Sequence, residues 1–372
     1  MNRCEALLAR GVVPNTQKLE QAQPIIRTAL SLLFVTVLLV ASIALGSAPA
    51  FAQFVGPMPL NLVNGWSGAP FTTSRATVEE VNGIVQFRGA IAGGTSAVAF
   101  TLPTAFRPAT SVYVAVDMCN ATNGRLVIQP TGVVSVQAET AFSNAQCFTS
   151  LDGASFARAS TGFTALTLMN GWTNAPFSTS NAEVEKIAGI VHFKGAIATT
   201  GTNAEPFTLP AAFRPITSVY VPVDMCNATN GRLFIDPSGV VTVQAESSFS
   251  NAQCFTSLDG AVFVATPSGF SALTPINGWT NAPFSTSKAA AGDAYGVVYF
   301  KGAIATVGTN TQPFTLPVQF RPVTNVYVPI DLCNATKGRL FIQTSGAVNV
   351  QAETVFSNAQ CFTSLDGASF VQ

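Results

Sequence analysis

The sequence predicts an all-β protein of three tandem antiparallel modules, of the β-sandwich or jelly-roll kind, behind an N-terminal signal segment. Three observations predict this class. One series of motifs occurs three times, apolar and polar residues alternate inside each copy, and Gly, Pro, Asn and Asp interrupt the apolar runs about every 8–12 residues. This combination is typical of antiparallel sandwiches.

The repeat is defined by motifs that keep their order in all three copies. Asn-Gly-Trp ends at Trp66, Trp172 and Trp279, followed by Ala-Pro-Phe, Leu-Pro-x-x-Phe-Arg-Pro, Cys-Asn-Ala-Thr and Ser-Asn-Ala-Gln-Cys-Phe-Thr-Ser-Leu-Asp-Gly. Units of this length are complete domains, because solenoid repeats usually have about 20–50 residues. The expected divisions are the signal segment (1–52), module 1 (59–164), module 2 (165–271) and module 3 (272–372).

Inside a copy the apolar period is two, as in a strand with one buried face. In module 2, for example, Leu233 and Ile235 are expected to face inward. Asn123-Gly124 and Asn230-Gly231 predict two-residue hairpin turns, and Pro222 predicts an edge strand or a bulge. Apart from the signal, no segment is expected to form an amphipathic helix.

The first 52 residues have the parts of a secretory signal. An uncharged apolar run covers 28–46, Arg27 precedes it, and Ala50-Phe51-Ala52 supplies the small residues of a cleavage site. We expect cleavage after Ala52 and a secreted or surface-exposed mature chain that begins at Gln53. The run is also long enough to span a bilayer, so a retained membrane anchor is the alternative. Basic residues before the run would leave the modules outside the cytoplasm in both cases.

Six of the seven cysteines form one pair per module, 28 residues apart, and Cys4 lies before the expected cleavage site. Regular pairs in an exported chain predict one disulfide per module. Free thiols and metal ligands are the alternatives, but two cysteines without a histidine cannot complete a zinc site. The expected disulfides are Cys119–Cys147, Cys226–Cys254 and Cys333–Cys361.

The composition argues against several functions. Charged residues make up 10% of the chain, and 18 basic residues balance 18 acidic ones, so there is no basic surface for nucleic acid. No phosphate loop, histidine-based metal motif or EF-hand is found. The lone His192 is expected to be solvated on a polar strand face, and Asp152-Gly153 is expected to be a tight turn. We therefore expect no catalytic residue, metal or cofactor, and a secreted hydrolase is the least favoured reading.

Recurring aromatic and polar residues are the candidate site residues. The tryptophans Trp66, Trp172 and Trp279 are candidate ligand contacts, with closure of the core as the favoured alternative. The asparagines of the Asn-Ala-Thr motifs match the glycosylation acceptor, with turn chemistry as the favoured alternative. They are Asn120, Asn227 and Asn334.

Two arginines per module are expected either to bind an anionic ligand or, as the favoured alternative, to pair internally with recurring carboxylates. The arginines are Arg107, Arg214, Arg321, Arg125, Arg232 and Arg339, and the carboxylates are Asp117, Asp224, Asp331, Glu139, Glu246 and Glu353.

A longer motif suggests a family. Phe-Thr-Leu-Pro-x-x-Phe-Arg-Pro, at 100–108, 207–215 and 314–322, follows Gly-x-Val-x-Phe-Lys/Arg-Gly and precedes Gly-Arg-Leu-x-Ile-x-x-x-Gly-x-Val. This order resembles the small β-sandwich modules at the C-terminal ends of phage tail fibres and related bacterial surface proteins. The resemblance implies the fold, recognition of surface glycans or proteins, and a tendency to trimerise. It implies no site residues. The disulfides, and the tandem arrangement behind a signal, depart from the pattern.

The leading hypothesis is therefore a secreted or surface-exposed binding or adhesive protein with three equivalent weak sites that act by avidity. Its expected partner is a surface glycan or protein, and membrane contact is expected only through an uncleaved N-terminal segment. The first alternative is a structural surface-layer or matrix component without a discrete site. The three modules are expected either to form an intramolecular pseudo-trimer or to follow one another as separate beads.

Overall fold

The computed structural model describes residues 53–266 and 268–372. The expected signal segment, its cleavage site and the alternative membrane anchor lie outside the described residues. Within the described ranges, no helix is both long and apolar enough to cross a membrane.

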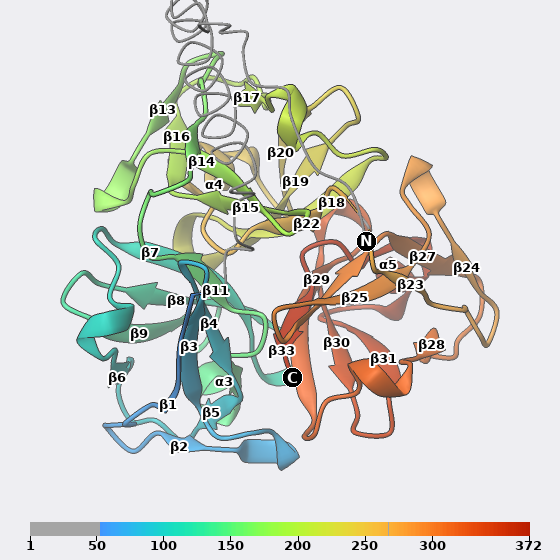
Figure 1. Cartoon of the computed structure of the whole chain (residues 1–372), viewed down its shortest axis with the longest axis horizontal. Helices are drawn as coiled ribbons and strands as arrows, with labels where there is room; N and C mark the ends of the chain where they lie inside the picture. The colour runs from blue at the N-terminus through green and yellow to red at the C-terminus, as the bar shows by residue number, and fades with distance from the viewer. Residues whose placement is uncertain (1–52, 267) are drawn as a thin grey trace, which may run out of the picture. The chain divides into compact units, whose positions relative to one another are not determined.

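The all-β prediction is confirmed, since each module is built from antiparallel strands in two four-stranded sheets and one small three-stranded sheet (Figure 1). The strands of module 1 are β1 (Phe54–Pro59), β2 (Ser67–Gly68), β3 (Thr77–Val81), β4 (Ile84–Arg88), β5 (Ala90–Ala92), β6 (Val98–Thr101), β7 (Val112–Asp117), β8 (Asn123–Ile128), β9 (Val133–Ala138), β10 (Thr149–Ser150) and β11 (Ser155–Ala157). They form the sheets β1-β3-β4-β11, β6-β9-β8-β7 and β10-β5-β2.

Modules 2 and 3 repeat this plan. Module 2 contains β12 (Thr164–Ala165), β13 (Trp172–Asn174), β14 (Glu183–Ile187), β15 (Ile190–Lys194), β16 (Ala196–Thr199), β17 (Phe207–Thr208), β18 (Val219–Asp224), β19 (Asn230–Ile235), β20 (Val240–Ala245), β21 (Thr256–Ser257) and β22 (Val262–Val264). Module 3 contains β23 (Ser271–Ala272), β24 (Trp279–Asn281), β25 (Ala290–Ala294), β26 (Val297–Lys301), β27 (Ala303–Thr306), β28 (Phe314–Thr315), β29 (Val326–Asp331), β30 (Lys337–Ile342), β31 (Ala347–Ala352), β32 (Thr363–Ser364) and β33 (Ser369–Val371).

Every module has its own apolar core between its two larger sheets. In module 1, Phe87 of β4 and Phe100 of β6 meet across these sheets with ring centroids 6.2 Å apart. Leu233 and Ile235 of β19 are fully buried, as their alternation predicts. Because apolar surface is removed from water within each module, the period-two pattern determines which side chains form the core.

The two predicted hairpin turns, at Asn123-Gly124 and Asn230-Gly231, are corrected. Asn123-Gly124 is not the hairpin turn, because both residues belong to β8 and the chain reverses through the 3₁₀ turn η3 (Cys119–Ala121). Gly124 is needed for packing instead, since a Cβ there would lie 2.0 Å from Cε of Met118. In module 2, Gly231 is likewise in β19 and not in a turn. Pro222 does lie in an edge strand, as predicted, because β18 ends its sheet.

Short helices also occur where none was expected. They are α3 (Phe142–Cys147), α4 (Phe249–Cys254) and α5 (Phe356–Cys361), and each ends at the second cysteine of its module. Six residues are too few for a helical period to stand out in a sequence, which explains why the pattern missed them.

Strand pairing shifts the module boundaries by a few residues. Strand β1 begins at Phe54, ahead of the expected start at residue 59, and pairs with β3 of module 1. Thr164 and Ser271 begin β12 and β23, which pair with strands of modules 2 and 3 respectively. Two-residue strands carry no alternation, so only the pairing itself assigns them to a module.

Candidate functional site

The tryptophans are core residues. Trp66, Trp172 and Trp279 are only 4–5% exposed, and each indole Nε1 donates to a backbone carbonyl at 2.8–2.9 Å. Trp66 also packs edge-on against Phe142 of α3, with centroids 6.2 Å apart. A buried ring with its polar atom satisfied cannot stack on a ligand, so the interpretation as ligand contacts is wrong and the core alternative holds.

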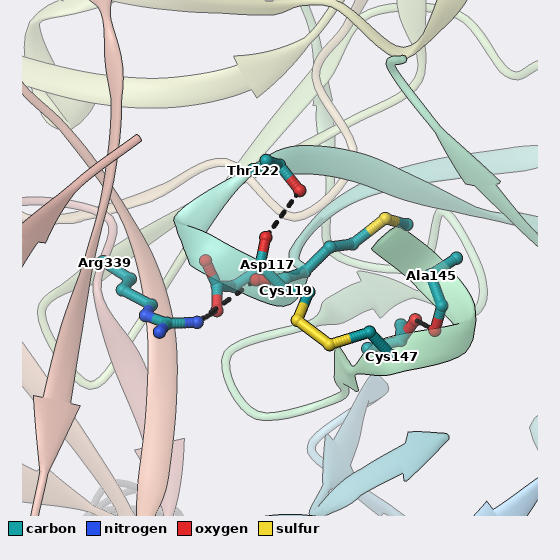
Figure 2. Close-up of a disulfide and its surroundings, with 8 residues drawn as sticks. Asp117, Cys119, Thr122, Ala145, Cys147 and Arg339 are labelled. Carbon is teal, nitrogen blue, oxygen red and sulfur yellow. Dashed lines mark hydrogen bonds and ion pairs between the residues drawn. A yellow bond between two sulfur atoms is a disulfide. The ribbon is translucent and has the colours of Figure 1, made fainter. Parts of the chain in front are cut away.

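The three expected disulfides, Cys119–Cys147, Cys226–Cys254 and Cys333–Cys361, are present. Their Cα–Cα distances of 5.7–5.8 Å are usual for disulfides. In module 1 the bond ties the η3 turn to α3 (Figure 2). Disulfides in every module are typical of an oxidising compartment.

The asparagines of the Asn-Ala-Thr motifs are exposed and adopt a left-handed backbone, with φ of 59–60°. Asparagine tolerates this conformation better than most residues. The threonine also has a local role, since Oγ1 of Thr122 donates to the carbonyl of Cys119 at 2.9 Å. Turn chemistry therefore accounts for the motif, and glycosylation of Asn120, Asn227 and Asn334 stays a prediction.

The expectation of a solvated His192 is corrected. Its side chain is only 4% exposed and meets the Tyr299 ring of module 3 edge-on, with centroids 6.2 Å apart. Burial lowers the pKa of His192 to about 4, so the imidazole is neutral at pH 7. The equivalent Gln86 of module 1 is also buried. The strand face that does not contact the module's own core is covered by neighbouring modules, which strand periodicity alone cannot reveal.

Charged side chains join the modules in a cyclic order. Arg125 of module 1 pairs with Asp224 of module 2 at 3.0 Å, and Arg232 of module 2 pairs with Asp331 of module 3 at 2.9 Å. Arg339 of module 3 returns to Asp117 of module 1 at 3.0 Å (Figure 2). These arginines therefore pair with the recurring aspartates, as favoured, but always across modules. We name the three contacts junction 1/2, junction 2/3 and junction 3/1.

The other recurring arginines have a structural role inside their modules. Nε of Arg107, Arg214 and Arg321 donates to the carbonyl oxygens of Leu102, Leu209 and Leu316 at 2.9–3.0 Å. In each Leu-Pro-x-x-Phe-Arg motif, these bonds connect the arginine at its end to the leucine at its start. Neither set of arginines therefore needs an anionic ligand to satisfy its hydrogen bonds.

Equivalent polar contacts accompany the ion pairs. Oγ of Ser150, Ser257 and Ser364 donates to the carbonyl of a tyrosine in the neighbouring module at 2.6–2.7 Å. The Asp-Gly pair follows this serine in each module. In module 1 its glycine allows the close approach of module 3, since a Cβ on Gly153 would lie 2.6 Å from Cγ1 of Val328. The predicted turn at Asp152-Gly153 is confirmed, since the amide of Ala154 donates to the carbonyl of Leu151 at 3.2 Å. The turn is not at the surface, because Asp152 is buried and its Oδ1 accepts from the Gly89 amide at 2.8 Å.

A pocket lies at each junction, and its walls come from both modules. Their volumes are about 150 Å³ at junction 3/1, 140 Å³ at junction 2/3 and 120 Å³ at junction 1/2. One module contributes a half-cystine, an asparagine of the Asn-Ala-Thr motif and two phenylalanines, and the other a tyrosine and an arginine. The linings are Phe71, Cys119, Asn120, Phe148, Tyr327 and Arg339 (3/1); Phe284, Cys333, Asn334, Phe362, Tyr220 and Arg232 (2/3); and Phe177, Cys226, Asn227, Phe255, Tyr113 and Arg125 (1/2).

One phenylalanine of each pocket is exposed and held in an unfavourable backbone conformation. Phe71, Phe177 and Phe284 are 58–59% exposed and have φ of 53–54°, in the left-handed region that bulky residues avoid. Such conformations cost about 1–3 kcal/mol each and occur preferentially at functional sites. The sequence marks these phenylalanines only by the recurrence of Ala-Pro-Phe, a motif that by itself predicts no binding site.

The pockets are aromatic but carry little net charge. At junction 1/2, the Arg125 guanidinium lies 4.9 Å from the Tyr113 ring centroid, while its Nη1 is bonded to Asp224. The guanidinium disfavours a cationic ligand, and the paired aspartate weakens its attraction for an anionic one. None of the lining residues is a carboxylate. The chemistry suits an uncharged group with an apolar face and hydrogen-bonding edges, such as a sugar ring or a protein side chain.

A cluster of carboxylates lies where the three modules meet. The carboxylate oxygens of Glu139, Glu246 and Glu353 approach within 4.8 Å of one another. Burial, reinforced by neighbouring carboxylates, raises the pKa of Glu139 and of Glu246 to about 7, and the Lys337 ammonium acts in the opposite direction. Burial also raises the pKa of Glu353. Because Lys337 already supplies a positive charge here, we assign no metal to this cluster.

Comparison of the chain with protein-family models, curated proteins and solved structures finds no match in any of the three. The resemblance to phage tail-fibre modules thus stays an expectation.

Proposed function

We propose that this chain is an exported binding or adhesive protein that holds a surface glycan or a surface protein in its three junction pockets. The proposal rests above all on one repeated observation, an exposed and conformationally strained phenylalanine at the rim of each of the three junction pockets. Burying Phe71, Phe177 and Phe284 against a ligand would use apolar surface that the fold leaves in water.

The arrangement of the pockets supports binding by avidity. A pocket of 120–150 Å³ holds only a small group, and one such contact is weak. Three equivalent pockets on one chain can engage neighbouring units of a repetitive ligand, which multiplies a weak affinity by about 10²–10⁴. A repetitive surface polymer or a densely displayed protein suits this arrangement.

The small pockets also favour a second candidate, a structural surface-layer or matrix component. Typical ligand sites have volumes of roughly 300–1,000 Å³, larger than any of the three junction pockets. In that case the exposed phenylalanines would contact other copies of the chain or other matrix components.

A binding experiment separates the two candidates. The mature chain is immobilised and exposed to defined polysaccharides, glycans and purified surface proteins, beside the triple variant F71A/F177A/F284A. We expect the native chain to bind at least one class, and the triple variant to bind more than about tenfold more weakly, because each truncation removes an aromatic contact. The matched control is Phe54→Ala, which removes another exposed phenylalanine, from β1.

The outcomes are decisive in both directions. Equal binding by the native chain and the triple variant would overturn the assignment of the pockets. Absence of binding to every probe, together with self-association that the triple variant loses, would favour the structural component.

Export is the second part of the proposal, supported by the disulfides and by the apolar run ahead of the modules. N-terminal sequencing of protein from the medium is expected to begin at Gln53. Recovery of the intact chain only in membrane fractions would favour the retained anchor.

A further inference from the structure

The three junctions are equivalent in their contacts but differ in their connection. Short chain segments, 157–163 and 265–270, join modules 1 and 2 and modules 2 and 3. Junction 3/1 brings together the first and last modules, which no segment joins directly. Its contacts alone must hold it closed.

One side chain also sets this junction apart. The residue before the glycine of Gly-Arg-Leu is Asn123 in module 1, Asn230 in module 2 and Lys337 in module 3. All three side chains are almost fully buried and reach the next module. Nδ2 of Asn123 and of Asn230 donates to a backbone carbonyl there at 2.7 Å.

The lysine makes a contact that the asparagines do not. Nζ of Lys337 lies 3.0 Å from Oδ1 of Asp117, while Arg339 takes Oδ2 of the same carboxylate. Figure 2 shows the pair of Arg339 with Asp117 beside the first disulfide. At the other junctions, the buried Oδ1 of Asp224 and of Asp331 has no hydrogen-bond partner among the described residues. Asp117 is therefore the one aspartate of the three with both oxygens paired.

We propose that Lys337 is the positioning residue that closes the three modules into a ring, acting through its ion pair with Asp117 at junction 3/1. A fully buried ammonium is unfavourable unless it is paired, so Lys337 favours the state in which module 3 meets Asp117. At junctions 1/2 and 2/3, the connecting segment keeps the partners at high effective concentration, and an asparagine suffices. The pocket at junction 3/1, between Phe71 and Tyr327, has both of its walls only when this junction is closed. Its use as a ligand site rests on the proposed function.

Three equivalent backbone hydrogen bonds provide the test. The amide of Ser111 donates to Ser178 across junction 1/2, that of Ser218 to Ser285 across junction 2/3, and that of Asn325 to Thr72 across junction 3/1. Amide hydrogen exchange of the mature chain, resolved by NMR, reports the opening of each junction separately.

Lys337→Asn gives junction 3/1 the same residue as its counterparts. We expect exchange at Asn325 to become at least about tenfold faster, as loss of one charge-assisted hydrogen bond predicts, with no change at Ser111 or Ser218. Lys337→Met keeps the aliphatic part of the side chain and removes the charge, and we expect it to accelerate exchange at Asn325 in the same way. Asn123→Lys, which offers Asp224 a second partner, should slow exchange at Ser111.

A merely structural role predicts another pattern. If Lys337 only stabilised module 3, its substitution would accelerate exchange in the module core, for example at Leu340, as much as at Asn325. That pattern, or unchanged exchange at Asn325, would overturn the proposal. Small-angle scattering adds a second readout, because opening exposes complementary faces of modules 1 and 3 and should produce concentration-dependent head-to-tail association.

The binding arm uses whichever defined polysaccharide or protein the native chain binds. Lys337→Asn should then lower the number of occupied sites from three to two. If exchange changes as expected but no probe binds the native chain, the closing role stands and the proposed function fails. If the Lys337→Asn variant keeps three occupied sites and exchange at Asn325 is unchanged, the closing role fails and the proposed function stands.

Discussion

The module cores and the junctions between modules are built from different combinations of contacts. A core such as that of module 2 is formed by apolar side chains at alternate strand positions, closed by a disulfide and sealed by a tryptophan. Junction 2/3 combines the ion pair of Arg232 with Asp331 and an apolar cluster that both modules share, in which Ile190 lies with Tyr299. This junction also holds the strained phenylalanine and the pocket. The strained phenylalanines and the pockets, which are the features suited to binding, thus lie between the modules and not inside their cores.

The largest expected effect tests the core. Leu233→Ala removes a fully buried side chain from the sheet of module 2. We expect a loss of about 2–5 kcal/mol in the free energy of unfolding, from lost burial and the cavity left behind. Urea unfolding measures the change, and Leu126→Ala should cost a similar amount in module 1. A loss of less than about 1 kcal/mol would contradict a well-packed core.

A smaller effect is expected at a junction. Asp331→Asn removes the charged partner of Arg232 and keeps the shape of the side chain. We expect a cost of about 1.5–3 kcal/mol, confined to junction 2/3, because water can reach the guanidinium once the junction opens. Exchange at the Ser218 amide should accelerate while the cores stay protected. The exposed Asp293→Asn is the control, and cooperative loss of a whole module would show that junctions and cores are not separable.

The response to pH should distinguish the two regions further. Burial raises the pKa of Asp224, Asp331, Glu139 and Glu246 to about 7. In the unfolded chain these carboxyls have the ordinary pKa values of aspartate and glutamate, 3.8 and 4.5. Between those values and pH 7 the folded state binds more protons, so stability falls as the pH rises through this window.

This pH dependence can be assigned by substitution. In the variant E139Q/E246Q/E353Q, whose side chains stay uncharged, the loss of stability between pH 5 and pH 8 should be smaller than in the native chain. Thermal unfolding at both values measures it. An identical loss in both proteins would assign the dependence to the buried aspartates instead. These are Asp224 and Asp331 at the junctions and carboxyls inside the modules such as Asp259, whose pKa burial also raises to about 7.

The smallest effect concerns the strain at a pocket rim. Phe177→Gly and Phe177→Ala both remove the ring and its edge-on contact with Phe255. They differ in backbone preference, because glycine adopts the left-handed region freely. We expect the glycine variant to be more stable than the alanine variant by about 1 kcal/mol. Equal stabilities would mean that the φ of 54° stores no strain.

How far the sequence predicts this protein can be seen at particular residues. The alternation around Leu233 and the spacing of Cys226 and Cys254 predicted core and disulfide, since both depend on local geometry. The hairpin turn predicted from Asn123-Gly124 was wrong, although the dipeptide is typical of hairpins. Here Gly124 leaves room for Met118, and Asn123 forms a hydrogen bond with the next module. The junction pockets were not predicted at all, because the walls of each come from two modules.

By itself, then, the sequence determined the all-β class, the three modules, the inward-facing residues and the disulfide pairs. These follow from periodicity and spacing within one copy. Only the tertiary structure decided that Arg125, Arg232 and Arg339 pair across modules, that His192 is buried, and that exposed phenylalanines stand beside tyrosines of another module. The physical reason is that a strand pattern distinguishes the two faces of a sheet, but the partner that covers the second face lies about a hundred residues away along the chain.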